Sequence, residues 1–291
     1  MFKKILLISL IFFPFCIFSQ IIGKDTRTIK PRVYLIGSIH NMHFNPDKNY
    51  SLNDLLEQIR SLKPDLVCGE ITPDAFNQAM EGYFPPEAAF LAEMASELNY
   101  RFIPVDWRLD FATQTMAYNH YPPSVKQQRL QLVDELKDRM KASKKTSFYD
   151  TLHDQAILSL LDSLYEKIIG PDALAEIAAG SWHERNRRAV ENGLANRGDA
   201  RTIVFVFGVD HVPQLQHQLK ALGIDALIAP RMFTPSTTYK VSQEVLDRWT
   251  RNLENLKRIR DKKIDVSLDS YQKVMDSKRI ENLEEAIQKS R

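Results

Sequence analysis

From Pro31 onward, short apolar runs alternate with stretches in which hydrophobic residues recur at helical spacing. Apolar runs at 33–36, 65–70 and 101–107 are separated by helical patterns over 52–62 and about 87–98. Ser51 and Asp54 form a capping-box pattern at the start of the first helix. This order of strands and helices predicts an α/β fold with a central sheet that is largely parallel or mixed and is flanked by helices. Pro104 argues against a central position for the third strand.

The second half of the chain predicts a helical insertion, two more strands and a helical tail. Residues 111–199 show amphipathic helical stripes and no strand pattern. Residues 202–207 are apolar throughout, which is typical of a strand buried on both faces, and 225–229 predict a last strand. We therefore expect an α/β domain over 20–235, with its insertion at about 111–199, and a charged helical tail over 236–291. We read the tail's charges as a solvated helix face, with partner binding as the alternative, and expect its deletion from Val241 onward to leave a folded core.

The N-terminal segment resembles a secretory signal peptide spanning residues 1–19. Lys3 and Lys4 precede an apolar run over 5–18, and Ser19 offers a small residue for cleavage. Cys16 follows Phe-Pro-Phe, a sequence unlike a lipoprotein cleavage site. We therefore expect an exported protein, periplasmic or secreted, which contacts a membrane only through this segment if it stays uncleaved.

Composition narrows the classes of partner. The chain has 39 Lys plus Arg against 37 Asp plus Glu, and without Lys3 and Lys4 the two counts are equal at 37. A balanced charge argues against nucleic acid as a partner, so we expect a small-molecule or peptide substrate. Cys68 would be the one cysteine left after cleavage, and we read it as a buried small hydrophobe rather than a nucleophile. A hydrophobic share of 44% is enough for an ordinary core without disulfides.

Polar, reactive residues terminate four of the predicted strands: His40, Glu70, Asp106 and His211. The carboxyl ends of parallel strands form the ligand crevice of an open α/β sheet, so these side chains should converge there. Two of these ends share the pattern Gly-x-x-His after an apolar strand. Structural alternatives stay open for each residue alone: either histidine could bond a loop carbonyl, Glu70 could cap a helix, and Asp106 could form a surface ion pair with Arg108.

Taken in order, these motifs resemble the TraB/PrgY–Tiki–GumN family, which belongs with the ChaN-like and erythromycin-esterase-like proteins. The resemblance rests on Gly37-x-x-His40, Glu70, Asp106-Trp107-Arg108, Glu184-Arg185-Asn186 and Gly208-x-x-His211, and it covers Val33 to Ala229 but not the tail. It implies a metal-dependent peptidase with His40, Glu70, Arg185 and His211 at the active site, although haem-binding and metal-free members are also known. The chain departs from the family pattern at Asp210, which precedes His211, and at Trp107, which separates Asp106 from Arg108.

Two neutral imidazoles and a carboxylate form a reasonable set of ligands for a divalent ion such as manganese, zinc or cobalt. The expected metal ligands are thus His40, Glu70 and His211, while Arg185 could bind a substrate carboxylate or a developing oxyanion. The leading hypothesis is an exported hydrolase of peptide or ester bonds, with or without a metal. The alternatives are a haem- or iron-binding protein without turnover and a metal-free esterase in which one histidine activates water. The candidate catalytic residues are His40, Glu70, Asp106, Arg108, Arg185 and His211.

The remaining histidines receive structural interpretations. His43 makes His-x-x-His with His40 but is read as a loop residue, and His153, His183 and His217 are assigned to helix surfaces or core edges. Residues 80–86 could close over the crevice or form a packed turn.

Overall fold

A computed structural model of the chain describes residues 30–236 and 238–291, so the expected signal peptide at 1–19 lies outside the described residues. Five strands form one sheet in the order β3–β2–β4–β1–β5. Every strand pair is parallel, which confirms the prediction of an α/β fold with a parallel sheet. The strands are β1 (Arg32–Ser38), β2 (Leu66–Gly69), β3 (Arg101–Pro104), β4 (Thr202–Gly208) and β5 (Leu227–Ile228).

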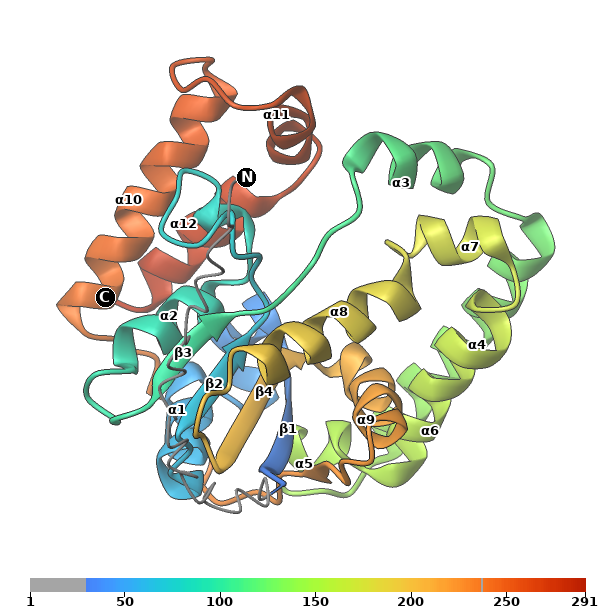
Figure 1. The fold of residues 1–291 in the computed structure, drawn as a ribbon, viewed down its shortest axis with the longest axis horizontal. Coiled ribbons are helices and arrows are strands. Elements are labelled where there is room, and N and C mark those ends of the chain that lie inside the picture. The colour runs from blue at the N-terminus through green and yellow to red at the C-terminus, as the bar shows by residue number, and fades with distance from the viewer. Residues whose placement is uncertain (1–29, 237) are drawn as a thin grey trace, which may run out of the picture.

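Helices and short helical turns connect and cover these strands (Figure 1). Among the described residues, no helix combines the length and the apolar character needed to cross a membrane. The α-helices are α1 (Leu52–Leu62), α2 (Pro86–Met94), α3 (Phe111–Asn119), α4 (Pro123–Ala142), α5 (Phe148–Leu152), α6 (Gln155–Asp162), α7 (Ala173–Ala178), α8 (Trp182–Ala195), α9 (Val212–Ala221), α10 (Gln243–Arg260), α11 (Leu268–Met275) and α12 (Arg279–Lys289). Shorter elements are the 3-10 helices η1 (His40–Phe44), η2 (Pro46–Lys48), η3 (Glu81–Tyr83) and η5 (Val209–His211), and the π-helix η4 (Ser163–Ile169).

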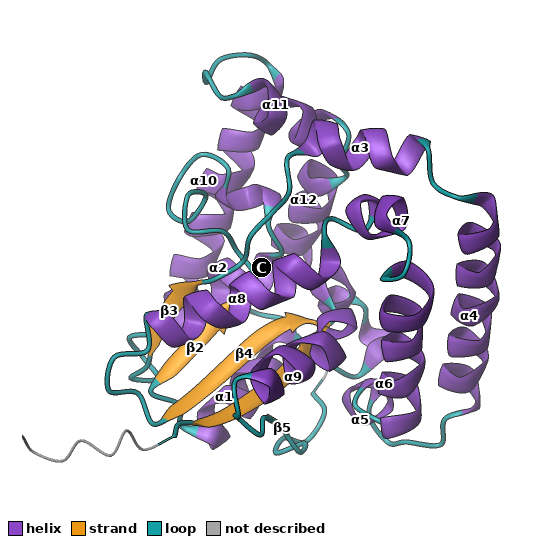
Figure 2. Cartoon of the chain, turned by 45° about the vertical axis from the view of Figure 1, so that its right-hand side comes forward, coloured by secondary structure: helices purple, strands orange, loops and turns teal. Residues whose placement is uncertain are grey.

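The central strand β4 shows how the sheet divides the core into two layers. Val204 and Val206 pack with residues of α1 and α2, whereas Ile203, Phe205 and Phe207 pack with residues of α6, α8 and α9. Successive side chains of a strand point to opposite faces, so a strand that is apolar at every position must be covered on both sides. The sheet therefore lies between two helical layers (Figure 2).

Local chemistry explains where two of the elements begin or end. The Ser51 hydroxyl accepts a hydrogen bond from the Asp54 N–H, and the Asp54 carboxylate accepts one from the Ser51 N–H at 2.8 Å, so the predicted capping box is confirmed. Pro104 lies in β3, an edge strand of the sheet, where a missing backbone N–H is tolerated.

In the insertion between β3 and β4, α6 and α8 pack on the sheet, whereas α3, α4 and α7 extend away from it (Figure 1). It has a small core of its own in which Leu164, Ile169 and Trp182 are buried. The helix α4 has no buried residue along its 20 positions. The Phe111 N–H at the start of α3 donates to the carboxylate of Asp269 in α11, so the insertion and the tail meet.

The tail is part of the main core. Val245 and Trp249 of α10 are fully buried in the hydrophobic cluster that includes α1, α2 and one face of the sheet. The Trp249 indole N–H donates to the Pro86 carbonyl at 3.2 Å. Arg248 contacts the carboxylates of Glu81 at 2.6 Å and Glu93 at 3.0 Å. Most charges of the tail thus occupy the outer face of its helices, while the inner face packs on the α/β domain and includes the buried Arg248.

Candidate functional site

The Glu70 side chain lies where the carboxyl ends of β1, β2 and β4 meet. Its Oε2 accepts the Gly208 N–H at 2.7 Å, and its Oε1 accepts from Arg185 Nη2 at 2.7 Å and Arg108 Nη2 at 3.1 Å. His40 Nε2 lies 3.7 Å from Glu70 Oε2, and His211 Nε2 lies 3.9 Å from Glu70 Oε1. The parallel register makes this convergence possible, because it brings strand ends that are far apart in the sequence to one edge of the sheet.

Two arginines connect Glu70 with the fully buried Asp106. Arg185, projecting from α8, donates through Nε and Nη2 to the two Asp106 oxygens at 2.8 and 3.0 Å, and Arg108 Nε donates to Asp106 at 2.7 Å. Burial alone raises the pKa of Glu70, but nearby positive charge, that of His40 first and then of the two arginines, outweighs burial and holds that pKa well below its ordinary value. The Asp106 and Glu70 carboxylates and the two guanidinium groups thus form a cross-linked cluster of contacts next to the two histidines.

His40 is held by a second carboxylate, that of Glu87 in the first turn of α2. Its Nδ1 lies 2.6 Å from Glu87 Oε1, and because a carboxylate only accepts, Nδ1 donates and Nε2 faces Glu70. The Ser38 hydroxyl also donates to Glu87, at 2.5 Å. Burial lowers the pKa of His40, but the charges of Glu87 and Glu70 outweigh burial and raise it above its ordinary value. The His40 side chain is 34% exposed, so its ring remains accessible at the rim of the site.

The backbone of His40 is strained, with φ of 50°. Non-glycine residues adopt this left-handed conformation at a cost, and such residues cluster at functional sites. This conformation places the His40 ring between α2 and the end of β2.

His211 has a different environment. Asn186 Nδ2 donates to the Trp182 carbonyl at 2.7 Å, which leaves Asn186 Oδ1 to accept from His211 Nδ1 at 2.7 Å. The ring stacks on the Trp182 indole with centroids 4.1 Å apart. Burial, followed by the charge of Arg185, lowers the pKa of His211 well below its ordinary value, against the opposing effect of Glu70. His211 is therefore a neutral imidazole with a lone pair on Nε2.

The structure brings all six predicted site residues into one network: His40, Glu70, Asp106, Arg108, Arg185 and His211. Sequence reasoning missed two residues that control them. Asn186 stands in the same Glu-Arg-Asn motif as Arg185, so its position was a usable signal, whereas Glu184 pairs on the helix surface with Arg187 and Arg188. Nothing in the sequence marked Glu87 as a site residue, apart from its place in the first turn of a predicted helix.

The predicted metal ligands do not fit a divalent ion as they are arranged. Oε1 of Glu70 is occupied by two guanidinium groups and Oε2 by a backbone N–H, so most of this carboxylate's accepting capacity is used and its charge is balanced. Two cations in contact with the same carboxylate would also repel a dication. Within the described ranges, these three residues do not form a group in which one donor atom from each lies within 4.8 Å of the others.

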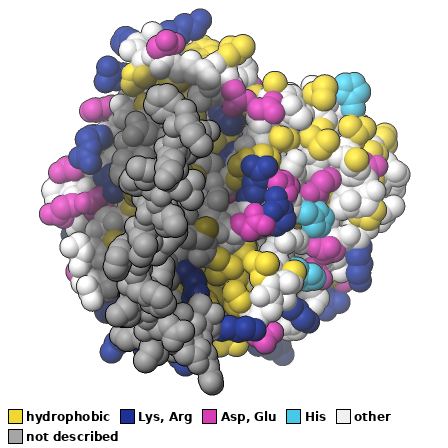
Figure 3. Space-filling view, viewed as in Figure 1, with side chains coloured by type: hydrophobic (Ala, Val, Ile, Leu, Met, Phe, Trp, Pro, Cys, Tyr) yellow, Lys and Arg dark blue, Asp and Glu magenta, His cyan; other side chains and the backbone are white. Residues whose placement is uncertain are grey.

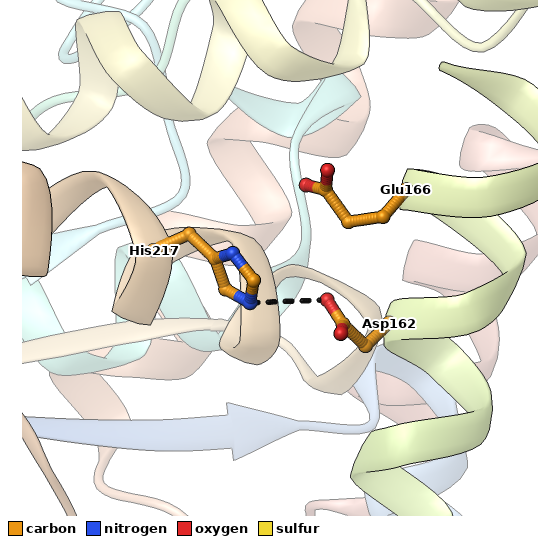
Figure 4. Close-up of side chains that lie close together, drawn as sticks. All are labelled: Asp162, Glu166 and His217. Atoms are coloured by element: carbon orange, nitrogen blue, oxygen red, sulfur yellow. Dashed lines mark ion pairs between the residues drawn. The ribbon is translucent and has the colours of Figure 1, made fainter. Parts of the chain in front are cut away.

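Such a group does exist elsewhere in the described part of the chain, at Asp162, Glu166 and His217 (Figure 4). His217 Nε2 lies 3.1 Å from Asp162 Oδ1, and Glu166 contacts His183 at 3.1 Å. These side chains are one third to one half exposed. A possible set of metal ligands is therefore present on the surface between the end of α6 and α9, and it was not predicted from the sequence.

The other predicted histidines fill structural positions. The His43 ring is fully buried; its Nδ1 donates to the Tyr50 carbonyl at 2.8 Å, and burial lowers its pKa to about 4. His153 Nε2 accepts the Gly37 N–H at 2.8 Å, and burial lowers its pKa also to about 4. Cys68 is fully buried, and burial raises the pKa of its thiol. None of these three side chains faces Glu70.

A cleft of about 590 Å³ opens beside Arg108. Tyr83 and Phe84, from the segment that we expected either to cover the crevice or to pack as a turn, line one wall. Ser270 and Lys273 of α11 line another wall, so the tail helps to enclose this space. On the face drawn in Figure 3, Lys and Arg side chains are interspersed with Asp and Glu side chains across the described part of the surface.

Comparison of the chain with protein-family models, with curated proteins and with solved structures finds no match.

Proposed function

We propose that this protein is a hydrolase of ester or peptide bonds in which His40 transfers protons and Glu87 orients it. The observation that carries the proposal is the His40–Glu87 contact of 2.6 Å, which fixes Nδ1 as a donor and leaves Nε2 directed at the centre of the site. A histidine with a raised pKa and an accessible ring suits general acid–base catalysis near neutral pH. The resemblance to the TraB/PrgY–Tiki–GumN family agrees with a hydrolytic reaction at these residues.

The attacking water would bind between His40 Nε2, Glu70 and His211 Nε2. The two histidine nitrogens lie 3.7 and 3.9 Å from the Glu70 carboxylate, distances that a bridging water can span. His40 Nε2 takes a proton from this water as its oxygen bonds to the substrate carbonyl carbon. The same proton then passes from His40 to the leaving oxygen or nitrogen as the bond to that atom breaks. His211 accepts the second hydrogen of the water and so orients it, because its own Nδ1–H is engaged by Asn186.

The two arginines, Arg185 and Arg108, stabilise negative charge in the site. Arg185 is buried and donates to Glu70 and Asp106 through Nε and Nη2, so it holds both carboxylates in place. Arg108 is 26% exposed and lines the cleft, so it can donate to the oxyanion that develops on the substrate. His40, Glu70 and His211 touch the reacting atoms in this scheme, and Asp106 acts through the two arginines.

Two other hypotheses use the same residues. A metal-dependent hydrolase would hold manganese, zinc or cobalt between His40, Glu70 and His211, which requires Glu70 to exchange an existing partner for the ion. A haem- or iron-binding protein would use the imidazoles as ligands without turnover. The Glu70 contacts with Arg108, Arg185 and Gly208 favour the metal-free reaction over both.

The test is hydrolysis of a panel of 4-nitrophenyl esters and fluorogenic dipeptides by the purified protein. We expect turnover that resists a chelator, is lost in His40→Ala, and is retained in the control His120→Ala, which removes an exposed histidine from the end of α3. Activity that a chelator removes and manganese, zinc or cobalt restores would establish the metal-dependent reaction instead. Absence of any turnover, together with a haem absorption band on adding haem, would establish the binding protein.

A further inference from the structure

Arg279, the first residue of α12, has a guanidinium group that no carboxylate among the described residues contacts directly. Within residues 30–236 and 238–291, its side chain forms no ion pair or hydrogen bond, although it lies over the Tyr83 ring with 5.7 Å from Cζ to the centroid. The side chain is only partly exposed. By contrast, the preceding Lys278 is exposed to solvent.

Its position at the start of a helix is electrostatically unfavourable. The N-terminus of an α-helix carries a partial positive charge, so a cation there is repelled unless something compensates for it. Burial lowers the pKa of Arg279, and the nearby charge of Arg108 lowers it further, against the attraction of Glu70 and Glu87. An unpaired cation in this place is a cost to the fold, which a bound anion would remove.

The surroundings of Arg279 belong to the site. Tyr83, beneath its guanidinium group, and Arg108, the cation that acts on it, both line the cleft of about 590 Å³. The charge of Arg279 also acts on His40. Arg279 thus lies beside a residue that lines the cleft, and its charge reaches the histidine that we place at the reacting bond.

We propose that Arg279, beside Arg108, binds a carboxylate group of the substrate at a subsite next to the scissile bond. This inference rests on the proposed hydrolase function and adds the class of substrate: an ester or amide that also carries a carboxylate. Arginine suits the role because its planar fork can donate two parallel hydrogen bonds to a carboxylate. The tail would then supply a binding residue to a site otherwise built from the α/β domain.

A monoanionic group suits this subsite better than a phosphate dianion. Glu70 and Glu87 are near enough for their charges to act on Arg279, and they would repel a dianion more strongly than a monoanion.

The test compares two esters and two anions on the full chain. The esters are 4-nitrophenyl acetate, which is neutral, and mono-4-nitrophenyl succinate, which carries a carboxylate. We expect the parent to favour the succinate ester in kcat/KM by at least tenfold, and Arg279→Gln to abolish that preference while Arg279→Lys retains part of it. Lys278→Gln, the matched exposed control one residue earlier, should keep the parent's preference.

Direct binding separates this proposal from the hydrolase proposal. Calorimetric titration with succinate should show binding to the parent and to Lys278→Gln, at least tenfold weaker binding to Arg279→Gln, and weaker binding of inorganic phosphate throughout. Succinate binding that depends on Arg279 without any ester turnover would keep the subsite and overturn the hydrolase. Turnover with no preference between the esters, or succinate binding that is absent or unchanged in Arg279→Gln, would overturn the subsite and leave the hydrolase standing.

Discussion

The ends of β1 and β4 carry the same Gly-x-x-His pattern, yet their surroundings shift the pKa values of the two histidines in opposite directions. Gly37 pairs with Phe207 and Ser38 with Gly208, so the second motif is displaced by one residue along the sheet. A shift of one residue turns a strand's side chains to the other face. The first motif accordingly meets the layer of α2 and the tail, where Glu87 favours the charged form of His40, and the second meets α8, where Asn186 engages a neutral His211.

This difference shows that a repeated motif need not mean a repeated role. One histidine has an acidic partner, a raised pKa and an exposed ring, which suit proton transfer. The other is buried between an indole and an amide with an arginine nearby, which suits a fixed acceptor. The following four experiments perturb one strand end at a time.

Deleting residues 241–291 removes the cover of the β1 end and should have the largest effect. The deletion exposes the face against which Val245 and Trp249 are fully buried, and replacing a buried tryptophan by alanine alone costs roughly 3–5 kcal/mol. Since whole domains are stable by about 5–15 kcal/mol, we expect cooperative thermal unfolding to disappear, contrary to the expectation from the sequence. Leu268→Ala, at a tail position that is 79% exposed, is the control and should melt like the parent. A cooperative transition in the truncated chain would show that the core is complete without the tail.

Arg185→Met should make the two strand ends more alike. It leaves Glu70 and Asp106 buried without their best partner, which we expect to cost about 3–5 kcal/mol in urea unfolding. It also removes a charge that opposes protonation of His211, so the pKa of His211 should rise, as measured by NMR titration of its ring protons. Arg187→Met, on the exposed side of the same helix, should change neither quantity appreciably. An unchanged His211 titration would mean that burial alone keeps this ring neutral.

Glu87→Gln removes the acidic partner of His40 alone. We expect kcat to fall about 100-fold, within the range for a disturbed general acid–base group. Because the charge of Glu87 raises the pKa of His40, the pH at which His40 titrates should move downward in the variant. Glu97→Gln, an exposed carboxylate shortly after α2, serves as the control. If NMR gives the same pKa for His40 in the variant and in the parent, Glu87 does not raise the pKa of this ring.

The contributions of His211 and His40 to the free energy of unfolding should depend on pH in opposite directions. The folded pKa of His211 lies below that of the unfolded chain, so its contribution is complete above about pH 6.5 and is lost as pH falls. His211→Gln should therefore flatten the decline of stability between about pH 6.5 and 5 by up to about 1.4 kcal/mol per pH unit. The pKa of His40 is raised in the folded state, so its contribution to stability is complete below about pH 6.5 and is lost as pH rises through that folded pKa. His40→Gln should therefore flatten the decline of stability with rising pH. Urea unfolding at several pH values measures both, and slopes of the same sign would refute the contrast.

The sequence predicted the elements and the meeting of the strand ends because both depend on local patterns. Apolar runs marked the strands, and the parallel-sheet rule placed His40, Glu70 and His211 at one edge. The register between β1 and β4 could not be inferred in this way, and it decides which layer each histidine meets. Glu87 and Asn186 remained hidden because their roles arise from that register. The helical stripe that contains Trp249 indicated a packed face, but it could not say which part of the molecule covers that face.

Gly208 has a consequence for how such a protein could change over evolutionary time. A Cβ at this position would lie 2.6 Å from His40 Nε2 and 3.5 Å from Glu70 Oε2, whereas one at Gly37 would meet the backbone and side chain of Val209. A single extra methyl group at Gly208 would thus displace the reactive ring while leaving the surrounding helices and strands in place. If the proposed hydrolysis takes place at this site, one codon change at Gly208 separates the chain from a folded, inactive descendant, and that change would leave almost no trace in overall sequence similarity.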